Sequence, residues 1–125
     1  MPIDYSFQQE GSTLLVTASS NEFTYEEALG YIQAVGEAAL SSQCSHILCD
    51  ETNLTHRLGL AETFELAEYS ANLAKQGNIR VVLLCHESVS QAIQLYENAT
   101  VNRGMNLKIT TSREEANAWL FGSAS

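Results

Sequence analysis

The feature of this chain that most constrains its fold is a regular alternation of strand-like and helix-like hydrophobic patterns. Two runs of alternating apolar and polar residues flank Glu10-Gly11-Ser12 and predict an antiparallel hairpin. After the hairpin, short apolar runs alternate with segments whose apolar residues recur with a period of about 3.6. The predicted strands cover residues 46–49, 79–85 and 107–110, and the predicted helices begin after Thr24, at Leu60, after Ser88 and after Ser112.

This order of elements predicts the architecture. A strand-helix-strand connection of this length is right-handed and produces parallel sheet. We therefore expect an α/β fold in which an N-terminal β-hairpin is followed by β-α repeats, giving a mixed five-stranded sheet with four helices. The 125 residues have the length of one domain, so we expect residues 1–125 to fold as a single unit.

The charge balance limits the partners. Fifteen acidic and six basic residues give a formal net charge of −9, and the first basic residue is Arg57. Binding to phosphate backbones or to anionic lipid surfaces requires clustered Lys or Arg, which this chain lacks. We therefore expect no nucleic-acid partner.

The sequence also indicates a compartment. The start Met1-Pro2-Ile3-Asp4 has neither the basic nor the apolar region of a signal peptide. No apolar run approaches the ~20 residues of a membrane span, so we expect no membrane insertion. Three cysteines without a C-x-x-C spacing fit reduced thiols better than a disulfide framework. These features predict a cytoplasmic protein.

Three short segments carry a resemblance to a known family. They are the strand and loop 47–55 (ILCDETNLT), the tripeptide Leu58-Gly59-Leu60, and the closing helix 113–120 (REEANAWL). Together with the order of elements, they make the chain resemble the STAS domain, and most closely the SpoIIAA-like group of small stand-alone bacterial proteins. That group is also compared with lipid-transfer domains of the CRAL-TRIO type. The resemblance implies a regulatory module that binds a protein partner and uses no cofactor.

The chain departs from this family at one functional position. In the family's anti-sigma-factor antagonists, a serine in an Asp-Ser-Ser-Gly-type turn is phosphorylated at the start of the second helix. Here the matching stretch reads His56-Arg57-Leu58-Gly59. The nearest hydroxyls are Thr55 and Thr52, which are therefore the candidates for any remaining phosphorylation.

A near-repeat suggests a metal site. Leu48-Cys49-Asp50-Glu51 and Leu84-Cys85-His86-Glu87 both end parallel strands, at the sheet edge where α/β proteins bind ligands. If the strand registers match, Cys49 and Cys85 lie side by side, with Asp50 and His86 near enough to complete a zinc-type ligand set. The alternative is that both thiols fill the core. Motifs for nucleophilic or phosphate chemistry are missing, so we expect no enzyme activity.

The second predicted helix carries a wider apolar arc than a sheet-covering helix needs. One stripe should face the sheet, and three further apolar residues fall outside it. We expect the excess to contact a neighbouring helix, a second copy of the chain or an apolar ligand. The stripe consists of Leu60, Phe64, Ala67, Ala71 and Ala74, and the residues outside it are Leu66, Tyr69 and Leu73.

Three functions remain open. The first is a non-enzymatic interaction module that binds a protein partner or itself through the polar loop 51–58 and the second helix. The second is a carrier of a small apolar or amphipathic ligand between that helix and the sheet, with Arg57 pairing an acidic headgroup. The third is a metal-dependent enzyme. The residues expected to bind the partner or ligand are Thr55, His56, Arg57, Leu66, Tyr69 and Leu73.

Overall fold

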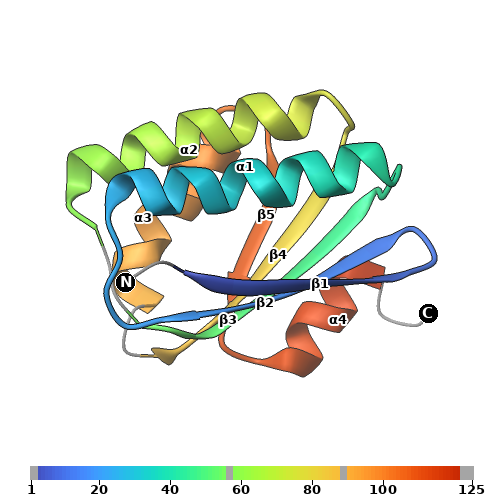
Figure 1. Ribbon diagram of the computed structural model, residues 1–125, viewed down its shortest axis with the longest axis horizontal. Helices are drawn as coiled ribbons and strands as arrows, with labels where there is room; N and C mark the ends of the chain where they lie inside the picture. Colours follow the sequence, from blue (N-terminus) through green and yellow to red (C-terminus); the bar gives the residue numbers. More distant parts are fainter. Residues whose placement is uncertain (1–2, 56–57, 88–89, 122–125) are drawn as a thin grey trace.

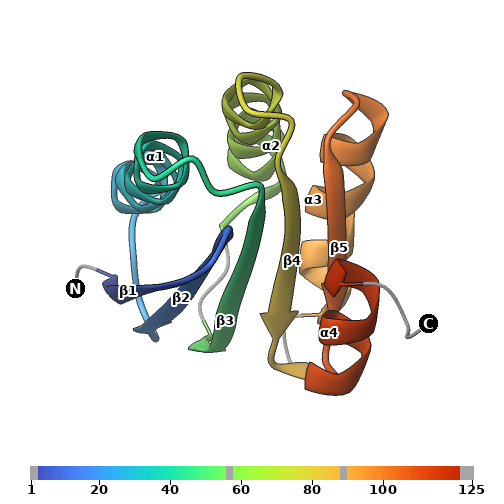
Figure 2. The same cartoon turned by 90° about the vertical axis from the view of Figure 1, so that its right-hand side faces the viewer.

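The computed structural model describes residues 3–55, 58–87 and 90–121, with the backbone alone described for 90–93. A five-stranded sheet in the order β1-β2-β3-β4-β5 forms the centre of the molecule. Figure 1 shows the sheet between two helical layers, and Figure 2 shows α4 on the face opposite α1 and α2. The elements are β1 (Asp4–Glu10), β2 (Thr13–Ser20), α1 (Tyr25–Ser41), β3 (His46–Leu54), α2 (Leu60–Lys75), β4 (Arg80–Cys85), α3 (Ser90–Asn102), β5 (Asn106–Thr110) and α4 (Arg113–Phe121).

The predicted architecture is confirmed. β1 and β2 form the antiparallel hairpin, and its two-residue turn contains Gly11 with a φ of 61°. β2, β3, β4 and β5 pair in parallel, each connected to the next by a helix. The chain therefore forms the mixed five-stranded sheet with four helices that the alternation of patterns predicts.

Local signals fix where the helices begin. The Thr24 hydroxyl accepts a hydrogen bond from the Glu27 amide (3.2 Å), and the Glu27 carboxylate accepts one from the Thr24 amide (2.8 Å). This capping box satisfies amides at the start of α1 that have no partner within the helix. The Ser112 hydroxyl likewise accepts from the Glu115 amide at the start of α4 (3.1 Å).

The sheet separates two hydrophobic clusters because successive side chains of a strand point to opposite faces. Ile47, Cys49, Val81 and Leu83 belong to the larger cluster, on the side of α1 and α2. Leu48 and Val82 point the other way, onto Ala116 and Leu120 of α4. The two sides of the sheet therefore have separate cores.

α4 is also held by charged groups at the sheet. The Arg80 guanidinium lies 4.4 Å from the centre of the Trp119 ring and donates a hydrogen bond to the Trp119 carbonyl (2.7 Å). Arg113 forms an ion pair with Asp50 at 3.0 Å. Both contacts lie on the side of the sheet that faces away from α1 and α2.

One predicted boundary is wrong. We expected residues 51–58 to form a polar loop, but β3 continues through Leu54. The strand can continue because β2 keeps pairing with it past an irregularity at Thr17–Ser19, up to Ser20 opposite Leu54. Glu51 therefore lies inside the sheet and not in a solvated loop.

The predicted orientation of α2 is partly wrong. Ala67, Ala71 and Ala74 are buried as expected, but Leu60 and Phe64 are 58% and 41% exposed, and Leu66 is buried instead. The reason is the position of the helix, because α2 approaches α1 and α3 more closely than it approaches the sheet. Its inward face is set by those two helices.

Within the described ranges, no helix combines the length and the apolar character that crossing a membrane requires.

Candidate ligand-binding cavity

A cavity of about 170 Å³ lies between α1, α2 and the face of the sheet beneath them. Its walls are mainly aliphatic. The lining residues come from α1, α2, α3 and the sheet, and most of them belong to the larger hydrophobic cluster. Residues that line it include Ile3, Tyr31, Val35, Ile47, Leu66, Leu73, Val81, Leu83 and Leu107.

α2 contributes both short and long side chains to the wall of the cavity. Ser70 and Ala74 line the cavity from α2, opposite Val81 and Leu83 of β4. At the same time, α2 is held close to α1. A Cβ atom added at Gly36 of α1 would lie 2.9 Å from Cδ1 of Leu73, so this glycine permits the close approach of the two helices. The helices pack together while space remains beneath them.

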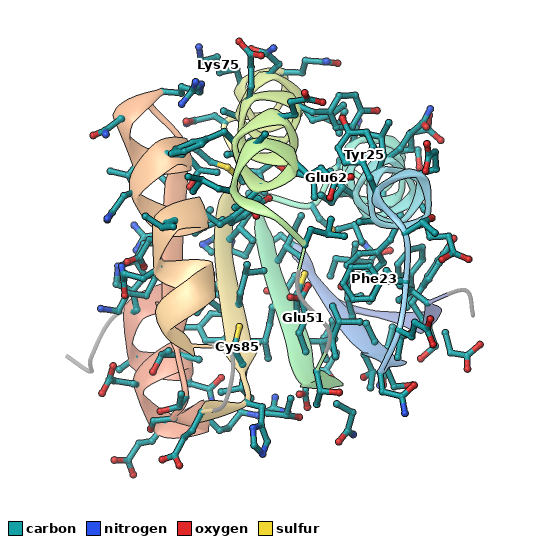
Figure 3. All side chains as sticks on the ribbon, turned by 90° about the vertical axis from the view of Figure 1, so that its left-hand side faces the viewer. Phe23, Tyr25, Glu51, Glu62, Lys75 and Cys85 are labelled. Atoms are coloured by element: carbon teal, nitrogen blue, oxygen red, sulfur yellow. The ribbon has the colours of Figure 1, made fainter. Side chains whose placement is uncertain are left out.

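Glu51 is the one charged side chain among the described residues that line the cavity. It is only 6% exposed, and its Oε2 atom accepts a hydrogen bond from the Tyr31 hydroxyl at 2.8 Å. Figure 3 shows Glu51 near Cys85, and the two residues lie opposite each other where β4 ends and β3 continues. The cavity is therefore apolar along most of its wall and carries a carboxyl group at one end.

The surroundings of Glu51 disfavour its ionised form. Burial raises the pKa of the Glu51 carboxyl from 4.5 to about 7. The hydrogen bond from Tyr31 partly opposes this rise in pKa, and the nearby negative charge of Asp50 adds to it. At neutral pH, Glu51 therefore exchanges between its protonated and ionised forms.

The other titratable groups around the cavity stay neutral at this pH. Burial, and next the negative charge of Glu51, raise the pKa of the Cys49 and Cys85 thiols and of the Tyr31 hydroxyl. Thiols with a raised pKa are poor nucleophiles and poor metal ligands, because both roles need the thiolate. Both cysteines therefore fit the alternative interpretation, in which they fill the core.

A second polar pair closes the wall between α2 and α3. The Ser70 hydroxyl donates to the Leu66 carbonyl at 2.8 Å and also contacts the Tyr96 hydroxyl. Because serine has one hydroxyl hydrogen, Tyr96 is the donor to Ser70. Both hydroxyl hydrogens therefore already have an acceptor within the protein. Glu51 is then the group best placed to bind a polar atom of a ligand.

The structure does not bring the proposed metal ligands together. The expected pairing of Cys49 with Cys85 is wrong, because Cys49 lies opposite Leu83 and Cys85 lies opposite Glu51. The pairing of β4 with β3 is shifted by two residues from the register that the near-repeat implied, in which Cys85 would lie opposite Cys49.

The polar members of that set point elsewhere. Asp50 faces away from Cys49 and pairs with Arg113, and His86 is exposed. In the part of the chain that the structure describes, no three His, Cys, Asp or Glu side chains lie close enough to share a metal ion.

The residues expected to bind a partner or ligand separate into three groups. Leu66 and Leu73 line the cavity, whereas Tyr69 is half-buried and is not among the lining residues. Thr55 is exposed, and its amide donates to the Ser20 carbonyl at 2.9 Å. His56 and Arg57 lie outside the described residues.

The second phosphorylation candidate, Thr52, is half-buried. Its hydroxyl donates to the Asp50 carboxylate at 2.6 Å, and its amide donates to the same oxygen at 3.2 Å.

The sequence interpretation missed the polar residues of the cavity. Tyr31 lies three residues after Ala28 and four before Val35, so the helical period already placed it on the buried face. Glu51 lies two residues after Cys49 and four after Ile47. The alternation of side chains along a strand therefore places all three on one face, provided that the strand continues past Cys49. Ser70 lies three residues after Ala67 and four before Ala74, so the helical period of α2 placed it on the buried face in the same way.

No protein-family model matches this chain, and no curated protein sequence matches it. The resemblance to the STAS domain therefore stays a prediction.

Proposed function

We propose that this protein is a non-enzymatic binding protein, a carrier or sensor that holds one small apolar molecule between α2 and the sheet. The observation that supports the proposal is the cavity of about 170 Å³ with a mainly aliphatic wall. Apolar cavities of ~150 Å³ in protein cores stay dry and accept a molecule the size of benzene. A ligand of similar or slightly larger size fits here.

The energetic cost of an empty cavity also supports ligand binding. Side chains that line an unfilled cavity lack partner atoms on one side and lose those packing contacts, although this cavity is partly open to solvent. The total stability of a domain is only ~5–15 kcal/mol, and cores usually contain few voids larger than a water molecule. A bound apolar molecule restores the missing contacts and recovers part of this cost.

Toluene is a suitable probe because it has the size of the cavity and no charge. We expect isothermal titration calorimetry to give saturable binding of one toluene per chain. Val81 lines the cavity, whereas its neighbour Val82 is fully buried against α4. Val81→Phe should fill the void, abolish toluene binding and leave stability unchanged or higher.

Val82→Phe is the matched control, with the same substitution one residue along the same strand. It faces a core without that void, so overpacking should destabilise it by ~1–3 kcal/mol. Equal destabilisation by both substitutions, together with no toluene binding, would refute the proposal.

The protein's unpaired thiols agree with a reducing compartment. Cys44, Cys49 and Cys85 are all free and buried. We propose a cytoplasmic location on this basis.

A second candidate function is the interaction module that the STAS resemblance implies. It is favoured by one observation, the exposure of Leu60 (58%) and Phe64 (41%) on the first turns of α2. Exposed Glu62 and Glu65 adjoin them, so a basic protein surface would be attracted. Leu66 does not contribute to this surface, because it is buried within the subunit.

Self-association is the form of this second candidate that needs no other protein, although it would bring the acidic Glu62 and Glu65 of two copies together and is disfavoured by their charge. Sedimentation of the wild-type protein and of Phe64→Glu should then show a dimer that the substitution dissociates, with an unchanged thermal midpoint. A wild-type protein that stays monomeric at high concentration would remove the homodimer from consideration.

A further inference from the structure

The charge inside the cavity points to the chemistry of its ligand. Glu51 is only 6% exposed, and it is the charged side chain in a wall that is mostly apolar and whose other polar side chains carry hydroxyl or thiol groups. The described residues that line the cavity include no Lys, Arg or His. The Tyr31 hydroxyl donates one hydrogen bond to Oε2, at 2.8 Å. A buried carboxylate has room for several such bonds and gains most from a cationic donor.

The charge of the whole molecule acts in the same direction. The formal net charge is −9, and no Lys or Arg occurs before residue 57. A field of this sign attracts cations and repels anions. A ligand with a carboxylate would also face Glu51 directly. The acidic headgroup that the sequence interpretation considered is therefore disfavoured, and a basic headgroup is favoured.

We infer that the ligand of this cavity is a small amine, with an apolar body against Leu66, Val81 and Leu83 and a protonated amino group paired with Glu51. This inference rests on the proposed function, because it names the class of molecule that the same cavity binds. The apolar body accounts for the aliphatic wall, and the ammonium group accounts for the single carboxylate at its end.

Three probes of nearly equal size separate the charge from the shape. Benzylamine is protonated at neutral pH like a lysine side chain, toluene is neutral, and benzoate is anionic. A hydrogen bond to a charged group in a buried site corresponds to about a 10- to 100-fold change in affinity. We expect calorimetry at about pH 8 to show benzylamine binding tighter than toluene by a factor in this range, and benzoate binding most weakly.

Glu51→Gln tests the role of the carboxylate. Glutamine has nearly the same shape and can still accept the Tyr31 hydrogen bond through its amide oxygen. The variant should lose the 10- to 100-fold preference for benzylamine and keep the affinity for toluene within about twofold. Glu68→Gln, an exposed position on α2, controls for the loss of one negative charge and should leave both affinities unchanged.

The pH dependence of wild-type binding gives a test that needs no variant. The titratable groups that face Glu51 are Tyr31 of α1, Cys49 of β3, Cys85 of β4 and Tyr96 of α3, and the charge of Asp50 acts on Glu51 from the other face of β3. The lining residues of α2 include none.

Because the tyrosines and thiols have raised pKa values, they stay neutral while Glu51 changes charge. Since the pKa of Glu51 is about 7, the affinity for benzylamine should rise about tenfold per pH unit up to that pH and then level off. The affinity for toluene should not rise with pH.

The outcomes separate the two proposals. If toluene and benzylamine both fail to bind, the cavity is not a ligand site and the proposed function fails. If toluene binds and benzylamine binds no tighter, the proposed function stands and the amine inference is overturned. A preference for benzylamine that Glu51→Gln retains would also overturn it, because another group would then supply the negative charge.

Discussion

The buried carboxyl of Glu51 makes the stability of the free protein depend on pH. Its pKa is 4.5 in an ordinary environment and about 7 in the folded protein. The folded state therefore holds this proton more tightly than the unfolded state does. Burial of Glu51 lowers the free energy of unfolding when the carboxyl is ionised. This loss is absent below about pH 4.5, grows as the pH rises, and is complete above about pH 7.

The size of this cost follows from the shift in pKa. At about 1.4 kcal/mol per pKa unit, the rise from 4.5 to about 7 corresponds to a loss of about 3 kcal/mol at high pH. Glu51→Gln removes the ionisation and keeps an acceptor for the Tyr31 hydroxyl. We expect the variant to match the wild-type protein near pH 4 and to exceed it by about 3 kcal/mol near pH 8. For a chain of 125 residues this is a difference of about 10 °C in thermal midpoint.

Urea unfolding followed by circular dichroism at several pH values measures this difference. The difference between the wild-type protein and Glu51→Gln isolates Glu51, because other groups titrate in both proteins. The Glu68→Gln control replaces an exposed carboxylate on the same side of the molecule. Parallel pH profiles for the wild-type protein and Glu51→Gln would refute the reasoning, since they would mean that Glu51 is solvated in the folded state.

Three further predictions concern the surroundings of the cavity. Tyr31→Phe removes the hydroxyl that stabilises ionised Glu51, so it should cost more stability at pH 8, about 2 kcal/mol, than at pH 5 in the same urea assay. Gly36→Ala should leave the free energy of unfolding unchanged or raise it by up to about 1 kcal/mol, because Leu73 can move into the cavity. A loss of more than about 1 kcal/mol would mean that Leu73 has no room to move. Arg113→Ala should cost at most about 1 kcal/mol and leave benzylamine affinity unchanged, because its ion pair is half-exposed on the opposite face; altered affinity would contradict that placement.

The fold could be predicted because local patterns determine it. The change from a period of two to a period of 3.6, and the capping pair Thr24 and Glu27, are properties of neighbouring residues. The right-handed rule for crossovers then determines the arrangement of the strands. The start of α2 at Leu60 agrees with the prediction, because the apolar period begins there.

The candidate site could be predicted only in part, because contacts between distant residues create it. The continuation of β3 to Leu54 depends on pairing with Ser20 of β2. The void depends on how α2 lies on α1 and α3, and the close contact of Gly36 with Leu73 is not visible in either segment alone. Of the three apolar residues of α2 outside the predicted stripe, Leu66 and Leu73 line the cavity, whereas Tyr69 does not.

The most direct test of the central claim is a crystal structure of the protein under xenon pressure, because xenon enters dry apolar cavities. We expect a xenon peak between α2 and β4, in contact with Leu66 and Val81, with little movement of the backbone. A structure in which α2 packs directly onto β3 and β4, with no xenon and no space beneath the helix, would contradict the account.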